Sequence, residues 1–305
     1  MGLALGVEIA GIKLKNPILS ASGCFGYGDE AQEFFDISQL GGVVTKSITP
    51  LPRVGHPPPK VAETASGMLN AIGLSNIGLE RFIVEKMPFL RNCKCAVIVN
   101  VAGRTINDYT LLAKRISAED GVHGLEINIS CPNVDAGGLE FGASETGAAK
   151  VINSVKKVSK VPIIAKLSPN VTDIAAIARA VENAGADAIS LINTLVGAGI
   201  DIKTREFRLS NKFGGLSGPA IKPVAVAMVY RVTRAVKIPV IGLGGISCGA
   251  DVIEFMLAGA TAVQIGTACF AEPKIFLRVL DELTAYLEEH GHRDINEIIG
   301  AVKGN

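Results

Sequence analysis

Several lysines and asparagines stand just after short apolar runs in this sequence, where a folded chain could bring them together. Lys46 comes shortly after GGVV and Lys166 after PIIA, and no local acid offsets either charge. Asn100, Asn128 and Asn193 occupy corresponding places, and an amide both donates and accepts hydrogen bonds. A single lysine there could simply reach solvent. Two of them among three amides, without a histidine or a carboxylate, predict a site for a planar, anionic ligand.

Cys131 lies in INISCPNVDAGG, residues 127–138, between an apolar run and a segment rich in turn formers. A lone cysteine there could be purely structural. A nucleophilic cysteine would need a histidine partner, and none of the four histidines stands in a comparable place. A general base needs only a thiol pKa near the working pH, and nearby cations lower the usual value of about 8.5. The two lysines therefore favour Cys131 as a general base.

Two glycine-rich segments are candidates for binding phosphate through backbone N–H groups. They are GLGGIS (242–247) and IGTA (265–268), and they follow the last two apolar runs of the chain. Ser247 stands where the dinucleotide fingerprint GxGxxG requires a glycine, so a dinucleotide is not indicated. A mononucleotide such as FMN fits better, with Lys166 able to stabilise the negative charge of a reduced flavin.

The elements that must position these residues are short runs without alternation, typical of parallel strands buried on both faces. Segments with helical periodicity separate them, and a series of strand–helix units predicts a closed (β/α)8 barrel rather than an open doubly wound sheet. Such a barrel brings the carboxyl ends of its strands to one face, where its site lies. The eight runs are NPILSA (16–21), GGVVTKS (41–47), CAVIVNV (95–101), GLEINIS (124–130), VPIIAKL (161–167), AISLIN (188–193), IPVIGLG (238–244) and AVQIGT (262–267), and the helices are expected near 29–36, 79–91, 105–120, 145–158, 172–185, 219–236, 249–258 and 273–289.

Two further segments stand out against this repeating pattern. VEIAGIKLK, before the first strand, alternates around Gly11 and predicts a small hairpin at the bottom of the barrel. Residues 48–78 carry five prolines and no long periodic run, which predicts an irregular functional loop after the second strand. Nothing in the composition marks a linker, so we expect residues 1–305 to form one domain.

Composition narrows the class of protein and its surroundings. The chain has 305 residues, is 48% hydrophobic and carries a net charge of +1 without a basic run, so nucleic acid is not an expected partner. No apolar stretch approaches about 20 residues, which argues against a membrane span. Six cysteines without a disulfide pattern indicate a reducing compartment, and we expect a cytoplasmic protein. Cys93 and Cys95 lack metal-site spacing, and no metal site is expected.

Motifs along the whole chain resemble those of dihydroorotate dehydrogenase, in the same order. They are NPILSASGCFGYG, VTKSIT, GMLNAIGLSNIG, INISCPNVDAGG, AKLSPN, INT, GGLSGPAI, GLGGIS and VQIGTA. The resemblance implies an FMN enzyme that oxidises dihydroorotate to orotate in pyrimidine synthesis. It also implies that the loop at 48–78 is a lid over the orotate site.

The resemblance assigns roles to matching residues. Cys131 resembles the base that removes the C5 proton of the substrate while a hydride leaves C6 for the flavin. The substrate set is Lys46, Asn70, Ala71, Ile72, Gly73, Leu74, Asn128, Asn133, Asn193 and Thr194. The FMN set is Ser22, Lys46, Ser47, Asn100, Asn128, Lys166, Ile192, Gly218, Gly244, Gly245, Gly266 and Thr267.

The resemblance also bears on the electron acceptor. Quinone-using relatives have an N-terminal extension and a serine base, unlike this chain. NAIGL and CPNVDAGGLEFG are similar to the NAD-linked type, which implies a partner subunit carrying FAD and a [2Fe–2S] cluster, in a heterotetramer built on a homodimeric core. A fumarate-using homodimer, another FMN barrel that reduces pyrimidines, and a non-catalytic barrel that binds a phosphorylated ligand remain alternatives.

Overall fold

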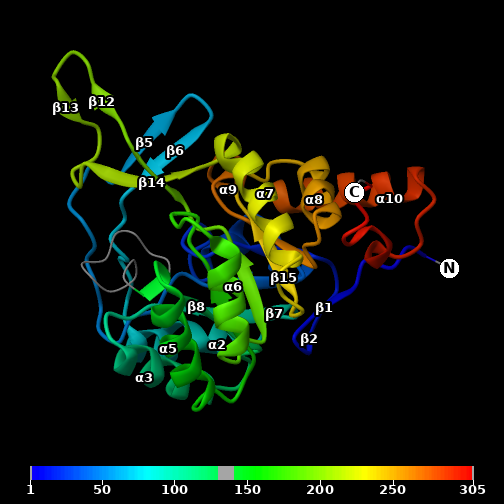
Figure 1. The fold of residues 1–305 in the computed structure, drawn as a ribbon, viewed down its shortest axis with the longest axis horizontal. Coiled ribbons are helices and arrows are strands. Elements are labelled where there is room, and N and C mark those ends of the chain that lie inside the picture. The colour runs from blue at the N-terminus through cyan, green and yellow to red at the C-terminus, as the bar shows by residue number, and fades with distance from the viewer. Residues whose placement is uncertain (1, 130–140, 304–305) are drawn as a thin grey trace.

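A closed barrel of eight parallel strands forms the centre of the computed structural model, which describes residues 2–129 and 141–303 (Figure 1). Around the barrel the order is β10-β15-β16-β3-β4-β7-β8-β9, so the strands follow one another in sequence and the last pairs with the first. Each predicted apolar run supplies one strand, and the predicted (β/α)8 barrel is confirmed. The strands are β3 (Ile18–Ser20), β4 (Gly42–Val44), β7 (Ala96–Val101), β8 (Gly124–Asn128), β9 (Ile163–Lys166), β10 (Ala188–Leu191), β15 (Val240–Leu243) and β16 (Ala262–Ile265).

The barrel strands are buried on both faces, as their unbroken apolar runs predict. Every residue of β3, β4, β7 and β8 is buried, and so is every residue of the other four strands. Between β3 and β4 the ladder is short, with Leu19 opposite Gly42. There the buried Ser20 hydroxyl accepts a hydrogen bond from the Val44 N–H at 3.0 Å and so continues the contact between the two strands.

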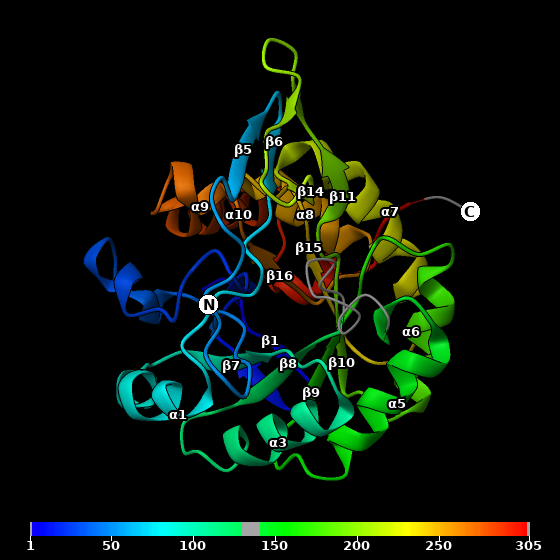
Figure 2. The same cartoon turned by 90° about the vertical axis from the view of Figure 1, so that its left-hand side faces the viewer.

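Helices surround the strands, as Figure 2 shows. Their ends follow the signals in the sequence: Asp173 accepts hydrogen bonds from Ala175 and Ala176 at the start of α6, and Gly185 and Gly259 take positive φ angles after α6 and α8. The helices are α1 (Leu79–Arg81), α2 (Met87–Leu90), α3 (Ile106–Ile116), α5 (Glu145–Lys156), α6 (Ile174–Asn183), α7 (Lys222–Thr233), α8 (Gly249–Leu257), α9 (Ala268–Ala271) and α10 (Ile275–Glu289), with a π-helical stretch η3 (Phe82–Lys86) and 3₁₀ turns η1 (Glu30–Glu33), η2 (Ile37–Gln39), η4 (Pro219–Ile221) and η5 (Ile295–Ile298).

The predicted N-terminal hairpin is present as β1 (Val7–Ile9) and β2 (Ile12–Leu14), an antiparallel pair. Ile12 packs against Gly124 at the first residue of β8, where a Cβ would lie 2.8 Å from the Ile12 Cδ1 atom. The hairpin therefore covers the amino-terminal end of the barrel, opposite the strand ends that carry the candidate site.

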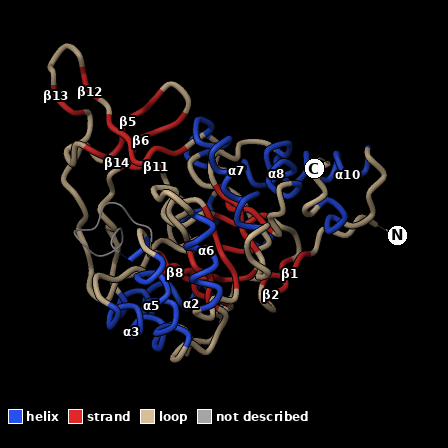
Figure 3. Tube along the Cα trace, viewed as in Figure 1, coloured by secondary structure: helices blue, strands red, loops and turns tan. Residues whose placement is uncertain are grey.

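Residues 48–78 form a long segment after β4, as predicted, but they are not irregular throughout. They contain a hairpin, β5 (Val61–Thr64) and β6 (Gly67–Asn70), which pairs with β14 (Phe213–Ser217) and through it with β11 (Leu195–Ala198) in a four-stranded sheet. A short ribbon of β12 (Ile200–Asp201) and β13 (Glu206–Phe207) extends from this sheet, and Figure 3 shows the whole assembly standing away from the barrel. The β5–β6 hairpin is local, but β6 pairs with β14, which lies far along the chain, so no local pattern specifies the sheet as a whole.

Candidate functional site at the carboxyl ends of the strands

A cavity of about 960 Å³ opens at the carboxyl ends of the barrel strands. This volume lies at the upper end of the range that small-molecule sites occupy. Ten of the predicted site residues line it: Ser22, Lys166, Ile192, Asn193, Thr194, Gly218, Gly244, Gly245, Gly266 and Thr267. The structure therefore brings together most of the residues that the sequence assigned to a flavin phosphate and ring, together with two assigned to the substrate.

The glycine turns along this cavity are shaped in a way that side chains would prevent. Gly218, Gly244 and Gly245 have φ angles of +98°, +129° and +80°, which residues with a Cβ rarely adopt. A Cβ on Gly218 would lie 2.6 Å from the Cα of Gly67, and one on Gly245 would lie 2.8 Å from the carbonyl oxygen of Gly218. These close approaches leave bare backbone facing the cavity, which is the type of surface that binds a phosphate group.

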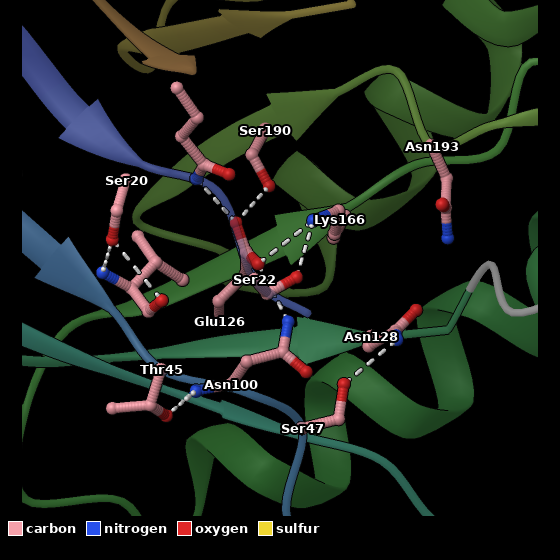
Figure 4. A network of polar contacts seen from close by, with 12 residues as sticks. Ser20, Ser22, Thr45, Ser47, Asn100, Glu126, Asn128, Lys166, Ser190 and Asn193 are labelled. Carbon is pink, nitrogen blue, oxygen red and sulfur yellow. Dashed lines mark hydrogen bonds and ion pairs between the residues drawn. The ribbon is translucent and has the colours of Figure 1, made fainter. Parts of the chain in front are cut away.

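Lys166, which lines the cavity, forms a buried ion pair with Glu126, which lies behind the lining (Figure 4). The Lys166 Nζ atom lies 3.2 Å from Glu126 Oε1 and donates a hydrogen bond to the Ser22 hydroxyl at 2.8 Å. Their side chains are 4% and 0% exposed. The prediction that no acid offsets this lysine was therefore wrong, because the acid comes from the middle of a neighbouring strand, β8, and not from a strand end.

Glu126 is held ionised by its surroundings. Burial alone would raise the pKa of its carboxyl group, but the charge of Lys166 and hydrogen bonds from Gln264, Asn100 and Ser190 outweigh burial and lower this pKa below its usual range. The donors lie 2.6 Å from the carboxylate for Gln264 and for Asn100, and 2.9 Å for Ser190. The Glu126 carboxylate and the Lys166 ammonium therefore form a charged pair in the site.

Two amide oxygens around this pair have no hydrogen-bond partner within the described part of the chain. They are Oδ1 of Asn100 and Oε1 of Gln264, and both are buried. A buried acceptor without a partner is costly, so these two oxygens are candidate acceptors for a group that binds here. Gln264 also lines the cavity, so its oxygen is available to a ligand that carries an N–H group.

Asn128 and Ser47 form a second polar contact, at the ends of β8 and β4. The Asn128 amide lies 3.4 Å from the Ser47 hydroxyl, and Figure 4 shows the two side chains facing each other. The buried Tyr109 hydroxyl donates a hydrogen bond to the Asn128 carbonyl at 2.9 Å and so fixes the end of β8 against α3. Asn128 lies two positions after Glu126 on β8, so the two side chains point to the same side of the strand.

The remaining predicted substrate residues lie on other elements. Lys46 follows β4 and is partly buried; burial lowers its pKa, the charge of Glu30 opposes this shift and that of Lys60 adds to it. Residues 70–74 begin at the last residue of β6 and continue toward the end of the 48–78 segment. The Asn70 amide donates a hydrogen bond to the Gly215 carbonyl at 3.1 Å. These residues are not among those that line the cavity within the described part of the chain.

Asn76, which the sequence analysis did not single out, connects the end of the 48–78 segment to its start. Its side-chain oxygen accepts from the N–H groups of Thr49 and Gly78, and its amide donates to the Thr49 hydroxyl at 2.8 Å and to the Leu74 carbonyl at 2.7 Å. The residue is buried, and three of the four contacts are buried with it, while the contact to Leu74 is partly exposed. The segment 70–74 is thereby held in one position relative to β4.

The predicted base Cys131 and the predicted substrate residue Asn133 lie outside the described residues. The cysteines that the structure does describe are not suited to act as a base. Burial raises the pKa of each of them, to about 11 for Cys24 and to about 12 for Cys95 and Cys269, with Cys93 and Cys248 also raised. Cys93 and Cys95 lie before β7, away from the cavity, and no group of three metal-ligating side chains occurs in residues 2–129 and 141–303.

Sequence reasoning missed Gln264, which lines the cavity, and Glu126 and Ser190, which lie behind the lining in the same hydrogen-bonded network. Each is a single polar residue inside an otherwise apolar strand, in GLEIN, AVQI and AISL. Residues of barrel strands alternate between the interior and the helices, so a polar residue in such a run marks an interior position.

The fold and this site define a (β/α)8-barrel protein with a cavity at the carboxyl ends of its strands, lined by glycine turns and a buried lysine. Comparison with known proteins identifies the family: its sequence profile, described as "Dihydroorotate dehydrogenase", matches residues 4–287. The chain belongs to the dihydroorotate dehydrogenase family, and the predicted resemblance is confirmed.

Individual relatives agree with this assignment. Proteins named "Dihydroorotate dehydrogenase B (NAD(+)), catalytic subunit" are 51% identical in Geotalea uraniireducens, with 98% of both chains covered, and 52% identical in Geobacter metallireducens, again with 98% of each covered. The namesake from Bacillus cytotoxicus is 52% identical and covers 97% of this chain and 96% of its own.

A solved structure described as "Crystal structure of DHODH in complex with ferulenol from Eimeria tenella" has the same fold. Its TM-score is 0.82 at 23% identity, and the match covers 98% of this chain and 88% of that one.

Proposed function

We propose that this protein oxidises dihydroorotate to orotate with FMN as its cofactor, in the synthesis of pyrimidine nucleotides. The observation that carries the proposal is the buried Lys166 ammonium, which lines a cavity bordered by glycine turns, in a chain about half identical to catalytic subunits named for this reaction. Residues 1–305 act as one domain in this proposal, and the protein works in the cytoplasm. The part of the chain that the structure describes contains no helix long and apolar enough to cross a membrane.

The residues fit FMN on the evidence of their donors and acceptors. The turns at Gly218, Gly244, Gly245, Gly266 and Thr267 offer backbone to the phosphate. Lys166 offers a cation, and the buried oxygens of Asn100 and Gln264 offer acceptors to the N–H of the ring. Ser22, Lys46, Ser47, Asn128 and Ile192 complete the proposed cofactor set. FMN, when bound, accepts a hydride from C6 of the substrate.

The substrate site in this proposal lies between the cavity and the segment after β6. Lys46 binds the carboxylate of dihydroorotate through its charge. The polar groups of the ring form hydrogen bonds with the amides of Asn70, Asn128, Asn133 and Asn193. Thr194 and the segment 71–74 (Ala71, Ile72, Gly73 and Leu74) shape the walls, and the β5–β6 hairpin limits access of water.

Cys131 acts as the general base in this proposal. Its thiolate removes the C5 proton, which moves to Sγ, while the electron pair of the C6–H bond leaves as hydride and the C5–C6 double bond of orotate forms. The raised thiol pKa values of the described cysteines leave none of those five as a competing base. Proton and hydride thus depart to two separate acceptors, and the charges balance.

Electrons leave this chain through a partner in our proposal. The catalytic subunits to which the chain is similar are named for NAD, and their name implies a second subunit. We infer a partner carrying FAD and a [2Fe–2S] cluster, in a heterotetramer of two catalytic and two partner chains around a homodimeric core. Reduction of NAD then takes place on the partner.

Turnover with different acceptors tests the function. The isolated chain should oxidise dihydroorotate with an artificial dye as acceptor, but should not reduce NAD until the partner is added. Dihydrouracil, which lacks the carboxylate, is the matched control and should not be oxidised at a comparable rate. Rapid turnover with fumarate by the isolated chain would contradict the NAD-linked assignment, and oxidation of dihydrouracil in preference to dihydroorotate would contradict the substrate.

A further inference from the structure

We propose that Glu126 is the positioning residue of the cofactor site: its carboxylate aims the Lys166 ammonium and two amides, and it offsets the Lys166 charge that would otherwise favour reduced FMN. The inference rests on the proposed function, because FMN is taken to be the ligand. Glu126 itself does not line the cavity and acts through its neighbours.

The Glu126 carboxylate accepts hydrogen bonds from side chains on four other strands of the barrel. Oε1 accepts hydrogen bonds from Asn100 on β7 at 2.6 Å and from Lys166 on β9 at 3.2 Å. Oε2 accepts from Ser190 on β10 at 2.9 Å and from Gln264 on β16 at 2.6 Å. Every one of these residues is buried, so the carboxylate holds donors that cannot turn to water instead.

An ionised carboxylate fixes the direction of each amide that contacts it. It accepts hydrogen bonds and cannot donate, so Asn100 and Gln264 must turn their NH₂ groups toward it. Their carbonyl oxygens then point elsewhere, and both are buried without a partner within the described residues. Glu126 therefore fixes the orientation of both amides, and it leaves the oxygen of Gln264, which lines the cavity, as an acceptor for a ligand N–H.

The same carboxylate limits the positive charge next to the ligand. Lys166 lines the cavity, whereas the negative charge of Glu126 lies 3.2 Å from its Nζ atom on the buried side. Reduced FMN is anionic near its ring, so an ammonium with no carboxylate behind it would bind the reduced form more tightly than the oxidised form. A glutamate that served only to stabilise the fold would not change this preference in a defined direction.

Glu126→Gln tests the proposal, because it keeps the side-chain volume and removes the charge. The measurement is the midpoint potential of bound FMN, which reports the ratio of the affinities for reduced and oxidised cofactor. We expect this ratio to rise about tenfold, which equals a shift of about 30 mV toward positive potential for a two-electron couple. A change of less than threefold, or a shift in the opposite direction, would overturn the proposal.

Ser190→Ala is the matched control, because it removes one hydrogen bond to the same carboxylate and no charge. In this variant the ratio of the affinities for reduced and oxidised FMN should stay within threefold of the wild-type ratio. A shift in midpoint potential as large as that of Glu126→Gln would show that charge is not the cause. If Glu126→Gln does not fold or hold FMN, Glu126→Asp decides the matter. The shortened carboxylate should weaken FMN binding about tenfold or more with an altered flavin spectrum, and wild-type affinity and spectrum would overturn the positioning role.

Failure of this inference differs visibly from failure of the proposed function. If the wild-type chain binds no FMN after incubation with it, the assignment of the cofactor falls. If the wild-type chain binds FMN and the variants leave its potential unchanged, the cofactor stands and the role of Glu126 falls.

Discussion

Replacing Lys166 by methionine should leave a buried carboxylate with no cation beside it and destabilise the folded chain. The Lys166 Nζ and Glu126 Oε1 atoms lie 3.2 Å apart, and the side chains are 4% and 0% exposed. At this separation an effective dielectric constant of about 20 gives an attraction of about 5 kcal/mol. Removal of one partner of a buried pair costs about 3–5 kcal/mol. We therefore expect the free energy of unfolding to fall by about 3 kcal/mol or more.

The assay is urea unfolding of the flavin-free wild-type and variant chains at pH 7, so that cofactor binding does not contribute. Lys156→Met is the matched control: Lys156 pairs with Asp187 at 2.5 Å, but the two side chains are 44% and 27% exposed. An exposed pair of this kind contributes less than about 1 kcal/mol. If Lys166→Met costs no more than Lys156→Met, the argument from the buried pair is refuted.

The pH dependence of the same comparison follows from the lowered pKa of Glu126. Its carboxyl has an ordinary pKa of 4.5 and a lower one in the folded chain, because Lys166 and three hydrogen bonds outweigh burial. The pair thus stabilises the wild-type chain above pH 4.5, and this contribution is lost as the pH falls through the folded pKa. The difference in the free energy of unfolding between wild type and Lys166→Met should become smaller below pH 4.5. A difference that stays constant in acid would contradict this account.

Three further predictions concern the proposed chemistry and the glycine turns. Cys131→Ser should slow reduction of the flavin by dihydroorotate about 100-fold or more at neutral pH in stopped-flow measurements, because a serine hydroxyl is a far weaker base; an unchanged rate would exclude Cys131. Gly218→Ala places a Cβ 2.6 Å from the Gly67 Cα at a φ of +98° and should weaken FMN binding about tenfold, whereas Gly291→Ala, at a φ of +73° with open space around it, should leave fluorescence titrations with FMN unchanged. The KM for dihydroorotate should rise as the pH increases toward the pKa of Lys46, which burial lowers below 10.5, and Lys46→Met should abolish that rise.

The barrel was predictable because each of its strands is a self-contained signal. Runs such as AVIVNV and GLEIN are apolar without alternation, which only a strand covered on both faces requires. The caps at Asp173 and Gly185 also act within one turn of the chain, so the residues alone indicate them. By contrast, the sheet of β11, β14, β6 and β5 pairs residues far apart in sequence, such as Asn70 with Gly215, and no local pattern specifies that pairing.

The site was predicted in part for the same reason. Lys166 and the turns at 244–247 and 266–268 end barrel strands, so their meeting at one cavity follows from the fold. The pairing of Lys166 with Glu126 depends on which residues of neighbouring strands face inward at one level, and this depends on the register of β8 against β9. The mistaken expectation of an uncompensated lysine came from considering strand ends alone.

The most direct test of the proposed function is anaerobic titration of the purified chain with dihydroorotate while flavin absorbance is recorded. We predict a yellow protein whose visible band bleaches as one equivalent of dihydroorotate per bound FMN is oxidised to orotate. A protein that binds FMN but keeps its visible band in excess dihydroorotate would contradict the proposed substrate.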